Sequence, residues 1–205
     1  MSPLSIPRTP SKFVIKGSPG AGKTTLAAEL ARRRSLTHIE LDGLHHGPNW
    51  EAPSPDVFRA RVQAELDKTN GRWVIDGNYD AKLDGFVIDQ ADAIIWLDLP
   101  FYVKFRRLWT RTIDRIVTNA ELWNGKRETW RGAFLSRDSL FIWFIRVHRR
   151  QRREWPSKLG GDPRVVRLHS SAEAAAWLDE VAGSEEMERR QIGVDDQSAV
   201  RISPR

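Results

Sequence analysis

The stretch from Gly17 to Thr24, which reads GSPGAGKT, constrains the fold more than any other part of the chain. It matches the phosphate-binding loop pattern, in which a glycine and four variable residues precede Gly-Lys-Ser/Thr. The apolar stretch 13–16 precedes it and helix-forming residues 25–31 follow it, so the strand, loop and helix that this pattern requires are all expected. A glycine-rich turn without a ligand needs neither the Gly-Lys-Thr ending nor this spacing. We therefore expect a site for a nucleoside triphosphate.

Each residue type in this loop suits one part of a polyphosphate. Glycines let backbone N–H groups converge on phosphate oxygens, and the following helix adds its free N–H groups and the positive end of its dipole. Lys23 can reach the outer phosphates, the Thr24 hydroxyl can ligate Mg²⁺, and Thr25 can contact the innermost phosphate. ATP with Mg²⁺ is the expected ligand, and GTP stays an alternative. The predicted binding residues are Gly17, Ser18, Pro19, Gly20, Ala21, Gly22, Lys23, Thr24 and Thr25.

Two further apolar stretches each lead to an Asp-Gly pair. Residues 37–42 predict a strand that ends in Asp42, and residues 73–76 predict a strand that ends in Asp76. Ligands of parallel sheets bind at the carboxyl ends of the strands, so both acids are expected beside the loop. Asp76 can orient Mg²⁺ through its water ligands, and Asp42 can bind a substrate hydroxyl or base, or hold Mg²⁺. The alternative for either acid is a turn or helix cap, which is a common use of Asp-Gly.

The remaining pattern alternates strands and helices. A nearly continuous apolar run at 93–99 predicts a central strand, and residues 164–168 predict the last one. Ser54 is expected to cap a helix that starts at Pro55, and Ser171 is expected to cap one that runs through Leu178. This alternation, with the site residues at strand ends, predicts an α/β fold with a doubly wound, five-stranded parallel sheet.

Length and composition predict one domain at 12–182, a flexible lead-in at 1–11 and a disordered tail at 183–205. The 205 residues contain no cysteine, the first residues lack the apolar core of a signal peptide, and no apolar run could span a bilayer, so we expect a soluble, cytoplasmic protein. Residues 101–155 hold 14 Lys or Arg against 5 Asp or Glu. Such a basic block suits nucleic acid, an acidic membrane surface or nucleotide phosphates, and composition does not choose among them.

A helix after Pro100 is expected to have two different faces. Phe105, Leu108, Trp109, Thr112 and Ile116 form one stripe, and Lys104, Arg107, Arg111 and Arg115 form another. The basic stripe is either a solvated face or part of a site. By composition the apolar run 140–145 suits a strand or a helix, and its helical flanks favour a helix.

From about Lys12 to Trp177 the chain resembles nucleoside-monophosphate-kinase-like P-loop proteins, most of all the adenylate-kinase-related group often labelled DNA topology modulation proteins. The resemblance is carried by the loop at 17–24, Leu41 to His45, Trp73 to Tyr79, Ala91 to Pro100, Arg107 and Arg111, Glu121 to Trp123, and Arg127 with Glu128. It implies a P-loop kinase fold with a basic helical lid at about 119–135. Arg107, Arg111 and Arg127 would neutralise the transferred phosphoryl group, and His169 and Ser170 would lie near the base.

The sequence departs from adenylate kinases directly after Gly77. There the Asp-Gly pair is followed by Phe-Pro-Arg, whose Arg grips the monophosphate, whereas Asn78 and Tyr79 follow here. The identity of the acceptor is therefore open.

The expected function is transfer of the γ-phosphoryl group of ATP to a small acceptor, with Asp42, Asn78 and Tyr79 facing that acceptor. Lys23, Arg107, Arg111, Arg127 and Asp42 are the predicted catalytic residues, and Thr24 and Asp76 are the predicted metal residues. Two alternatives stay open: a nucleic-acid-binding protein that is switched by a nucleotide, and an ATP-hydrolysing regulator without an acceptor.

Overall fold

The computed structural model describes residues 10–45, 53–118 and 140–184. Its centre is a sheet of five parallel strands in the order β2-β3-β1-β4-β5. The strands are β1 (Lys12–Gly17), β2 (Thr37–Glu40), β3 (Trp73–Asp76), β4 (Ala93–Leu97) and β5 (Val165–Leu168). The prediction of a five-stranded parallel α/β sheet is confirmed.

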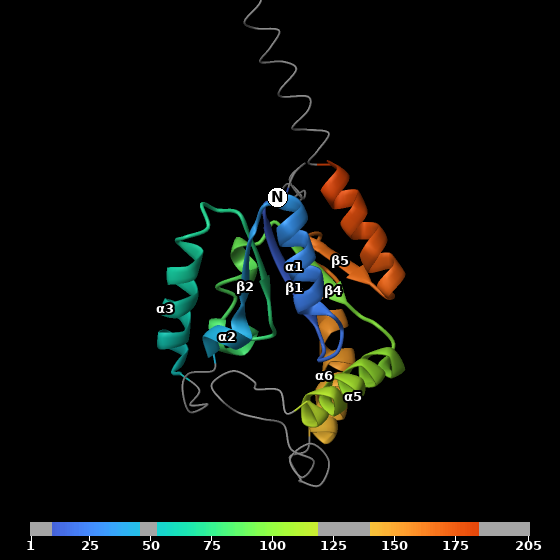
Figure 1. Ribbon diagram of the computed structural model, residues 1–205. Helices are drawn as coiled ribbons and strands as arrows, with labels where there is room; N and C mark the ends of the chain where they lie inside the picture. Colours follow the sequence, from blue (N-terminus) through green and yellow to red (C-terminus); the bar gives the residue numbers. More distant parts are fainter. Residues whose placement is uncertain (1–9, 46–52, 119–139, 185–205) are drawn as a thin grey trace, which may run out of the picture.

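Helices cover both faces of this sheet (Figure 1). The bounds are α1 (Lys23–Arg34), α2 (Leu41–His45), α3 (Pro55–Leu66), α4 (Asp80–Leu83), the 3-10 helix η1 (Ile88–Gln90), α5 (Phe101–Val117) and α6 (Leu140–Leu159), followed by a helix at 171–184. Because strand side chains alternate between faces, Phe13 and Ile15 pack with α1 and helix 171–184, while Val14 packs with α3. Trp96 packs against Trp155 of α6 on the same face as Val14.

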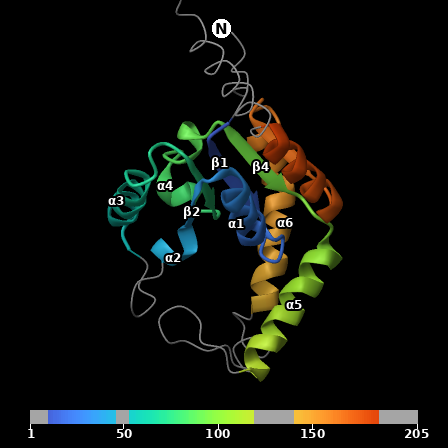
Figure 2. The ribbon, with the colours of Figure 1, turned by 45° about the horizontal axis from the view of Figure 1, so that its top comes forward.

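The helices α5 and α6 form a separate aromatic contact. Leu108 of α5 is fully buried against Phe141 and Phe144 of α6, and Phe105 packs on both phenylalanines. Both helices extend beyond the edge of the sheet from which the loop after β1 emerges (Figure 2). This pair therefore forms one wall beside the carboxyl ends of the strands.

Two local predictions were wrong by small amounts, and one open alternative is settled. β2 ends at Glu40, because α2 begins at Leu41, so Asp42 lies in the first turn of a short helix rather than at the end of a strand. Ser170, not Ser171, caps helix 171–184: its Oγ accepts a hydrogen bond from the Glu173 N–H, and Glu173 accepts one from the His169 N–H. The sequence left open whether the basic stripe of α5 is solvated, and for Lys104, which is only 2% exposed, a solvated position is excluded.

Other predictions of local structure are confirmed. Ser54 caps α3 by accepting a hydrogen bond from the Val57 N–H, with Pro55 as the first helical residue. The run 140–145 is helical and begins α6.

No helix among the described residues is long and apolar enough to cross a bilayer. The lid predicted at 119–135 and Arg127 lie outside the described residues, as do most of the predicted lead-in and tail.

Candidate nucleotide-binding site

The loop between β1 and α1 is tightly enclosed, and two of its glycines show why. Gly20 has φ +75°, and a Cβ at this position would lie 2.4 Å from the carbonyl oxygen of Lys104 in α5. Gly22, the N-cap of α1, has φ +94°. Both positions have a backbone conformation that L side chains rarely adopt, so both favour glycine. The close approach of α5 at Gly20 and the start of α1 after Gly22 together restrict the path of the loop.

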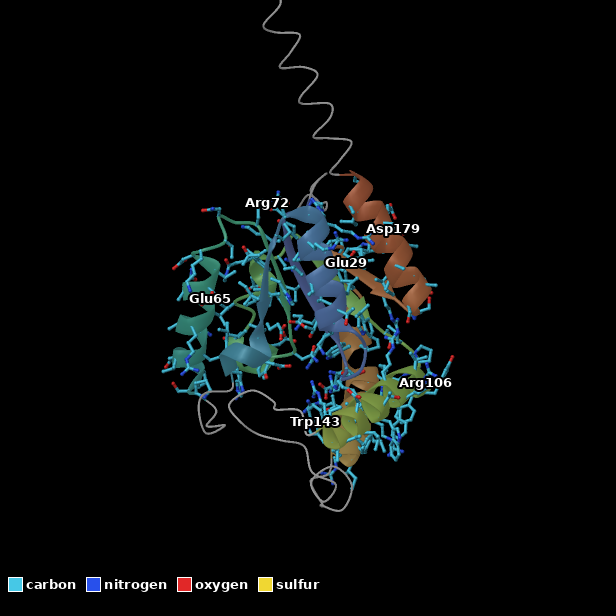
Figure 3. All side chains as sticks on the ribbon, viewed as in Figure 1. Glu29, Glu65, Arg72, Arg106, Trp143 and Asp179 are labelled. Carbon is cyan, nitrogen blue, oxygen red and sulfur yellow. The ribbon has the colours of Figure 1, made fainter. Side chains whose placement is uncertain are left out.

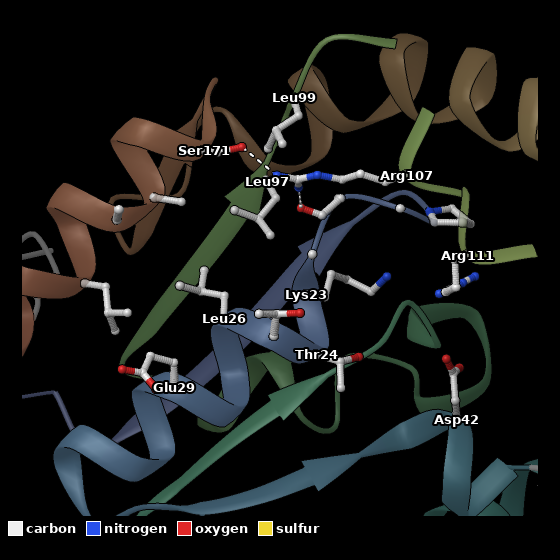
Figure 4. Close-up of a pocket in the computed structure, with 18 of the residues that line it drawn as sticks. Lys23, Thr24, Leu26, Glu29, Asp42, Leu97, Leu99, Arg107, Arg111 and Ser171 are labelled. Carbon is white, nitrogen blue, oxygen red and sulfur yellow. Dashed lines mark hydrogen bonds between the residues drawn. The ribbon is translucent and has the colours of Figure 1, made fainter. Parts of the chain in front are cut away.

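Lys23 is the first residue of α1 and lines a pocket with its charged end. Burial lowers its pKa, and the carboxylates of Asp42 and Asp76 oppose this effect. Figure 4 shows the ends of the Lys23, Arg111 and Asp42 side chains pointing toward the same region. A polyphosphate in this region would add the negative charge that favours the ammonium form of Lys23.

Thr24 and Asp76 come from different elements and meet at the carboxyl edge of the sheet. The Thr24 hydroxyl donates a hydrogen bond of 2.6 Å to Oδ2 of Asp76, whose residue is 4% exposed. His38 Nε2 lies 3.4 Å from the other oxygen of this carboxylate. A hydroxyl and a carboxylate are oxygen ligands of the kind that Mg²⁺ takes when phosphate oxygens and water complete its shell, so this pair fits the metal. The described residues contain no cluster of three or more His, Asp or Glu that could bind a metal without such help.

Two arginines of α5 reach the loop. Arg107 donates to the carbonyl of Ala21 over 3.3 Å and to Oγ of Ser171 over 2.8 Å, so it bridges the loop and helix 171–184. Arg111 lines the same pocket one turn further along α5. The pattern of spaced arginines identified both residues, but Ser171 was expected only as a helix cap.

A cavity of about 640 Å³ runs along the loop from helix 171–184 to Asp42 (Figure 4). Its wall near helix 171–184 is mainly apolar, which suits a base, and the loop side is cationic. His169 and Ser170 do not line it. The lining residues are Pro19, Gly20, Ala21, Gly22, Lys23, Thr24, Thr25, Leu26, Glu29, Asp42, Leu97, Leu99, Arg107, Arg111, Leu140, Trp143, Ser171, Ala174, Ala175 and Leu178.

The segment after Gly77 differs from its predicted role. Asn78 does not face an acceptor: its Nδ2 donates to the Gly17 carbonyl over 2.8 Å, and its Oδ1 accepts from the Gly17 N–H over 3.4 Å. The carboxamide therefore pairs with the backbone where the phosphate loop begins. Tyr79 instead donates a hydrogen bond of 2.6 Å to Oδ1 of Asp42. Burial, and then this carboxylate, raise the pKa of Tyr79, so its phenol stays a donor.

Sequence reasoning missed two buried lysines beside the loop. Lys16 in β1 is 2% exposed and pairs with Asp80 of α4, which fastens the segment 77–80 to the central strand. Lys104 lies 3.1 Å from Nδ1 of His148 in α6. A lysine within the apolar run 13–16 was a signal for the first pair, but the sequence offers no comparable signal for the second.

The chain is similar to a known protein over part of its length. No family model matches the chain. A cytidylate kinase of Pyrococcus horikoshii is 28% identical over 115 residues, which are 52% of this chain. The match spans only 60% of the length of that curated relative.

The solved structures extend the likeness to the fold. A shikimate kinase of Bacteroides thetaiotaomicron superposes with a TM-score of 0.53 at 16% identity, over 87% of this chain and 99% of that one. A gluconokinase of Sinorhizobium meliloti matches 88% of this chain and 98% of its own at 19% identity, with a TM-score of 0.48 that adds nothing to the assignment. The parallel sheet order and the loop after β1 agree with this likeness. The chain therefore has the P-loop kinase fold of the nucleoside-monophosphate-kinase-like type.

Proposed function

We propose that this protein is a phosphotransferase that moves the γ-phosphoryl group of ATP to a small acceptor. The observation that carries the proposal is that Lys23, Thr24, Arg111 and Asp42 line one pocket, with Thr24 bonded to the carboxylate of Asp76. Phosphoryl transfer asks the protein mainly for positioning and for stabilisation of charge on the transferred group. The residues that line this pocket can supply both the positioning and the stabilisation of charge.

Each part of the site has a separate task in this proposal. The backbone N–H groups of Gly20 and Gly22 and the first turn of α1 bind the phosphates, and Lys23 balances the charge of the outer ones. Mg²⁺, held by Thr24 and Asp76, would neutralise further phosphate charge when it is bound. Arg107 and Arg111, which line the same pocket, would stabilise the charge of the moving group.

Transfer of label from γ-³²P-ATP tests the function directly. The protein is incubated with Mg²⁺, labelled ATP and mixtures of nucleosides, nucleoside monophosphates and polyols, and the products are separated from inorganic phosphate. We expect a labelled organic product that Lys23→Ala abolishes. Lys68→Ala, at an exposed position after α3, should leave the product unchanged. Release of inorganic phosphate alone would favour a hydrolase, and the absence of any turnover would favour a nucleotide-dependent switch.

A second candidate function is binding of nucleic acid by α6. Its arginines Arg146, Arg149, Arg150, Arg152 and Arg153 are all exposed. Figure 3 shows Arg106 and Trp143 at the α5–α6 end of the molecule. Filter binding of duplex DNA at two salt concentrations tests this candidate: phosphate contacts give an affinity that falls steeply with salt and that Arg149→Ala with Arg152→Ala weakens. Retention without salt dependence would exclude it.

A further inference from the structure

The pocket that Lys23 lines also contains a carboxylate. Asp42 in α2 lines the cavity, and its Oδ1 accepts the hydrogen bond of Tyr79. The Tyr79 ring packs 4.6 Å from the ring of His45 and 5.2 Å from that of Phe58, so the phenol itself is held in place. Oδ2 of Asp42 receives no hydrogen bond from the residues that the structure describes. One oxygen of the carboxylate is thus oriented by the protein, while the other is left to face a ligand.

The basic side chains of α3 and α4, next to α2, already have protein partners. Arg61 donates to the carbonyl of Leu44 over 3.0 Å. Arg59 donates to the carbonyl of Leu83 over 3.4 Å, and Lys82 Nζ contacts His45 Nε2. Asn78, at the position where adenylate kinases begin their phosphate-gripping segment, is paired with Gly17. These elements do not direct a cation at the acceptor side of the pocket.

Phosphate monoesters and alcohols need opposite surroundings as acceptors. A monoester brings up to two negative charges, which require cations and are repelled by a carboxylate, and its attacking oxygen is already ionised near neutral pH. An alcohol brings no charge but must lose a proton as it bonds to phosphorus. An aspartate that accepts this proton is the arrangement that protein kinases use for substrate hydroxyls.

On the basis of the proposed phosphotransferase function, we propose that the acceptor is an alcohol, not a phosphate monoester, and that Oδ2 of Asp42 takes the proton of its hydroxyl group. As the acceptor oxygen bonds to the γ-phosphorus, the bond from that phosphorus to the bridging oxygen of ADP breaks, and ADP leaves with the electron pair. Lys23 and Arg111 lie on the side where the charge of the phosphoryl group develops. Tyr79 is a positioning residue that keeps the Asp42 carboxylate turned toward the pocket.

Matched acceptor pairs test the acceptor class. ADP release from Mg·ATP is measured with cytidine against CMP, uridine against UMP and adenosine against AMP, and with glycerol and hexoses as further alcohols. We expect alcohols and not monophosphates to raise the rate. Asp42→Asn should lower the alcohol-dependent kcat by about 10²- to 10⁴-fold, the usual contribution of a general base. Tyr79→Phe should lower the same rate less.

Asp84→Asn is the matched control, because Asp84 is exposed at the end of α4 with φ +46°, a conformation that Asn tolerates. It should leave the rate unchanged. Calorimetric titration with CMP adds a readout apart from turnover: Asp42→Asn should bind CMP more tightly than the wild type, since a repulsive charge is gone.

The outcomes separate the two proposals. If CMP, UMP or AMP raises ADP release more than its nucleoside, and Asp42→Asn does not impair this rate, the acceptor is a monoester and only the present inference is overturned. If neither class raises ADP release, the phosphotransferase function itself fails and the inference falls with it.

Discussion

Thr24 and Asp76 illustrate how single residues of this chain acquire a role from their position in the fold. They are 52 residues apart in the sequence, yet the first residues of α1 and the last residue of β3 bring their oxygens to 2.6 Å. The strand-end rule predicted the location of Asp76 beside the loop, and it was nearly right for Asp42. It could not predict the partners of Asn78 or Tyr79, because a side chain two or three residues beyond a strand can turn to either side, and only the local hydrogen bonds decide its direction.

Asp76→Asn should separate the binding of the metal from that of the nucleotide. The amide oxygen can still accept the hydrogen bond from Thr24, but the negative charge that favours Mg²⁺ is lost. We expect the affinity for Mg·ATP to fall by about tenfold or more, equivalent to about 1.4 kcal/mol, whereas ATP in EDTA binds no more weakly than to the wild type. Calorimetric titration with and without Mg²⁺ measures both affinities. An equal loss in the two titrations, or the same loss in Asp84→Asn, would contradict the metal role.

At the scale of elements, α5 is the helix on which the loop depends. Its backbone touches the loop at Gly20, its Arg107 binds the carbonyl of Ala21, and its Lys104 is buried against α6. The 3.6-residue period correctly grouped Arg107 and Arg111 on one side of the helix, but Lys104, which it placed with them, is buried like Leu108 and Thr112. It could not show that this side meets the loop, since periodicity gives the side of a helix and not what packs against it.

Gly20→Ala should be much more harmful than Gly71→Ala. The two glycines have nearly the same φ, +75° and +74°, but a Cβ meets the Lys104 carbonyl at Gly20 and open space at Gly71. The backbone penalty of about 1–2 kcal/mol is therefore common to both, and only Gly20→Ala adds a steric cost of about 1–3 kcal/mol. Urea unfolding measures the difference, and ATP titration should show weaker binding for Gly20→Ala alone. Equal stabilities would show that α5 does not restrain the loop.

Lys104 should make stability depend on pH. Burial, the main cause, lowers its pKa from 10.5 to about 8 in the folded protein, with Asp98 opposing and Arg152 assisting. Between these values the unfolded chain binds more protons than the folded one, so this contribution to stability rises with pH from about 8 to 10.5. The cost of burying the charged lysine is complete below pH 8 and disappears above 10.5.

Lys104→Met should consequently be more stable than the wild type at pH 7, and this advantage should shrink by pH 10. Urea unfolding at both pH values measures it, with Lys68→Met, at an exposed ion pair, as the control for general effects of lost charge. If the difference in unfolding free energy between Lys104→Met and the wild type is the same at pH 7 and pH 10, the lowered pKa of Lys104 is contradicted.

At the scale of the whole molecule, the alternation of strands and helices was sufficient to predict the parallel sheet. A short run that is apolar throughout, such as 93–97, fits a strand that helices cover on both faces of a parallel sheet. The glycine pattern at 17–24 identified β1 as the strand that leads into the phosphate-binding loop. The arrangement of the helices at the carboxyl edge was less predictable. The bridge from Arg107 to Ser171 joins residues 64 positions apart, and such pairings depend on how two helices pack rather than on any local pattern.

Binding of Mg·ATP to the wild type, to Lys23→Ala and to Lys68→Ala is the most direct test of the central claim that the loop at 17–25 binds the phosphates of a nucleotide. Lys23 lines the pocket where the phosphates are expected, whereas Lys68 forms an exposed pair with Glu65. In calorimetric titrations we expect one ATP per chain and a loss of affinity of at least about 100-fold, or about 2.7 kcal/mol, in Lys23→Ala. Lys68→Ala should bind ATP as the wild type does. Equal affinity for ATP in all three proteins would contradict the account.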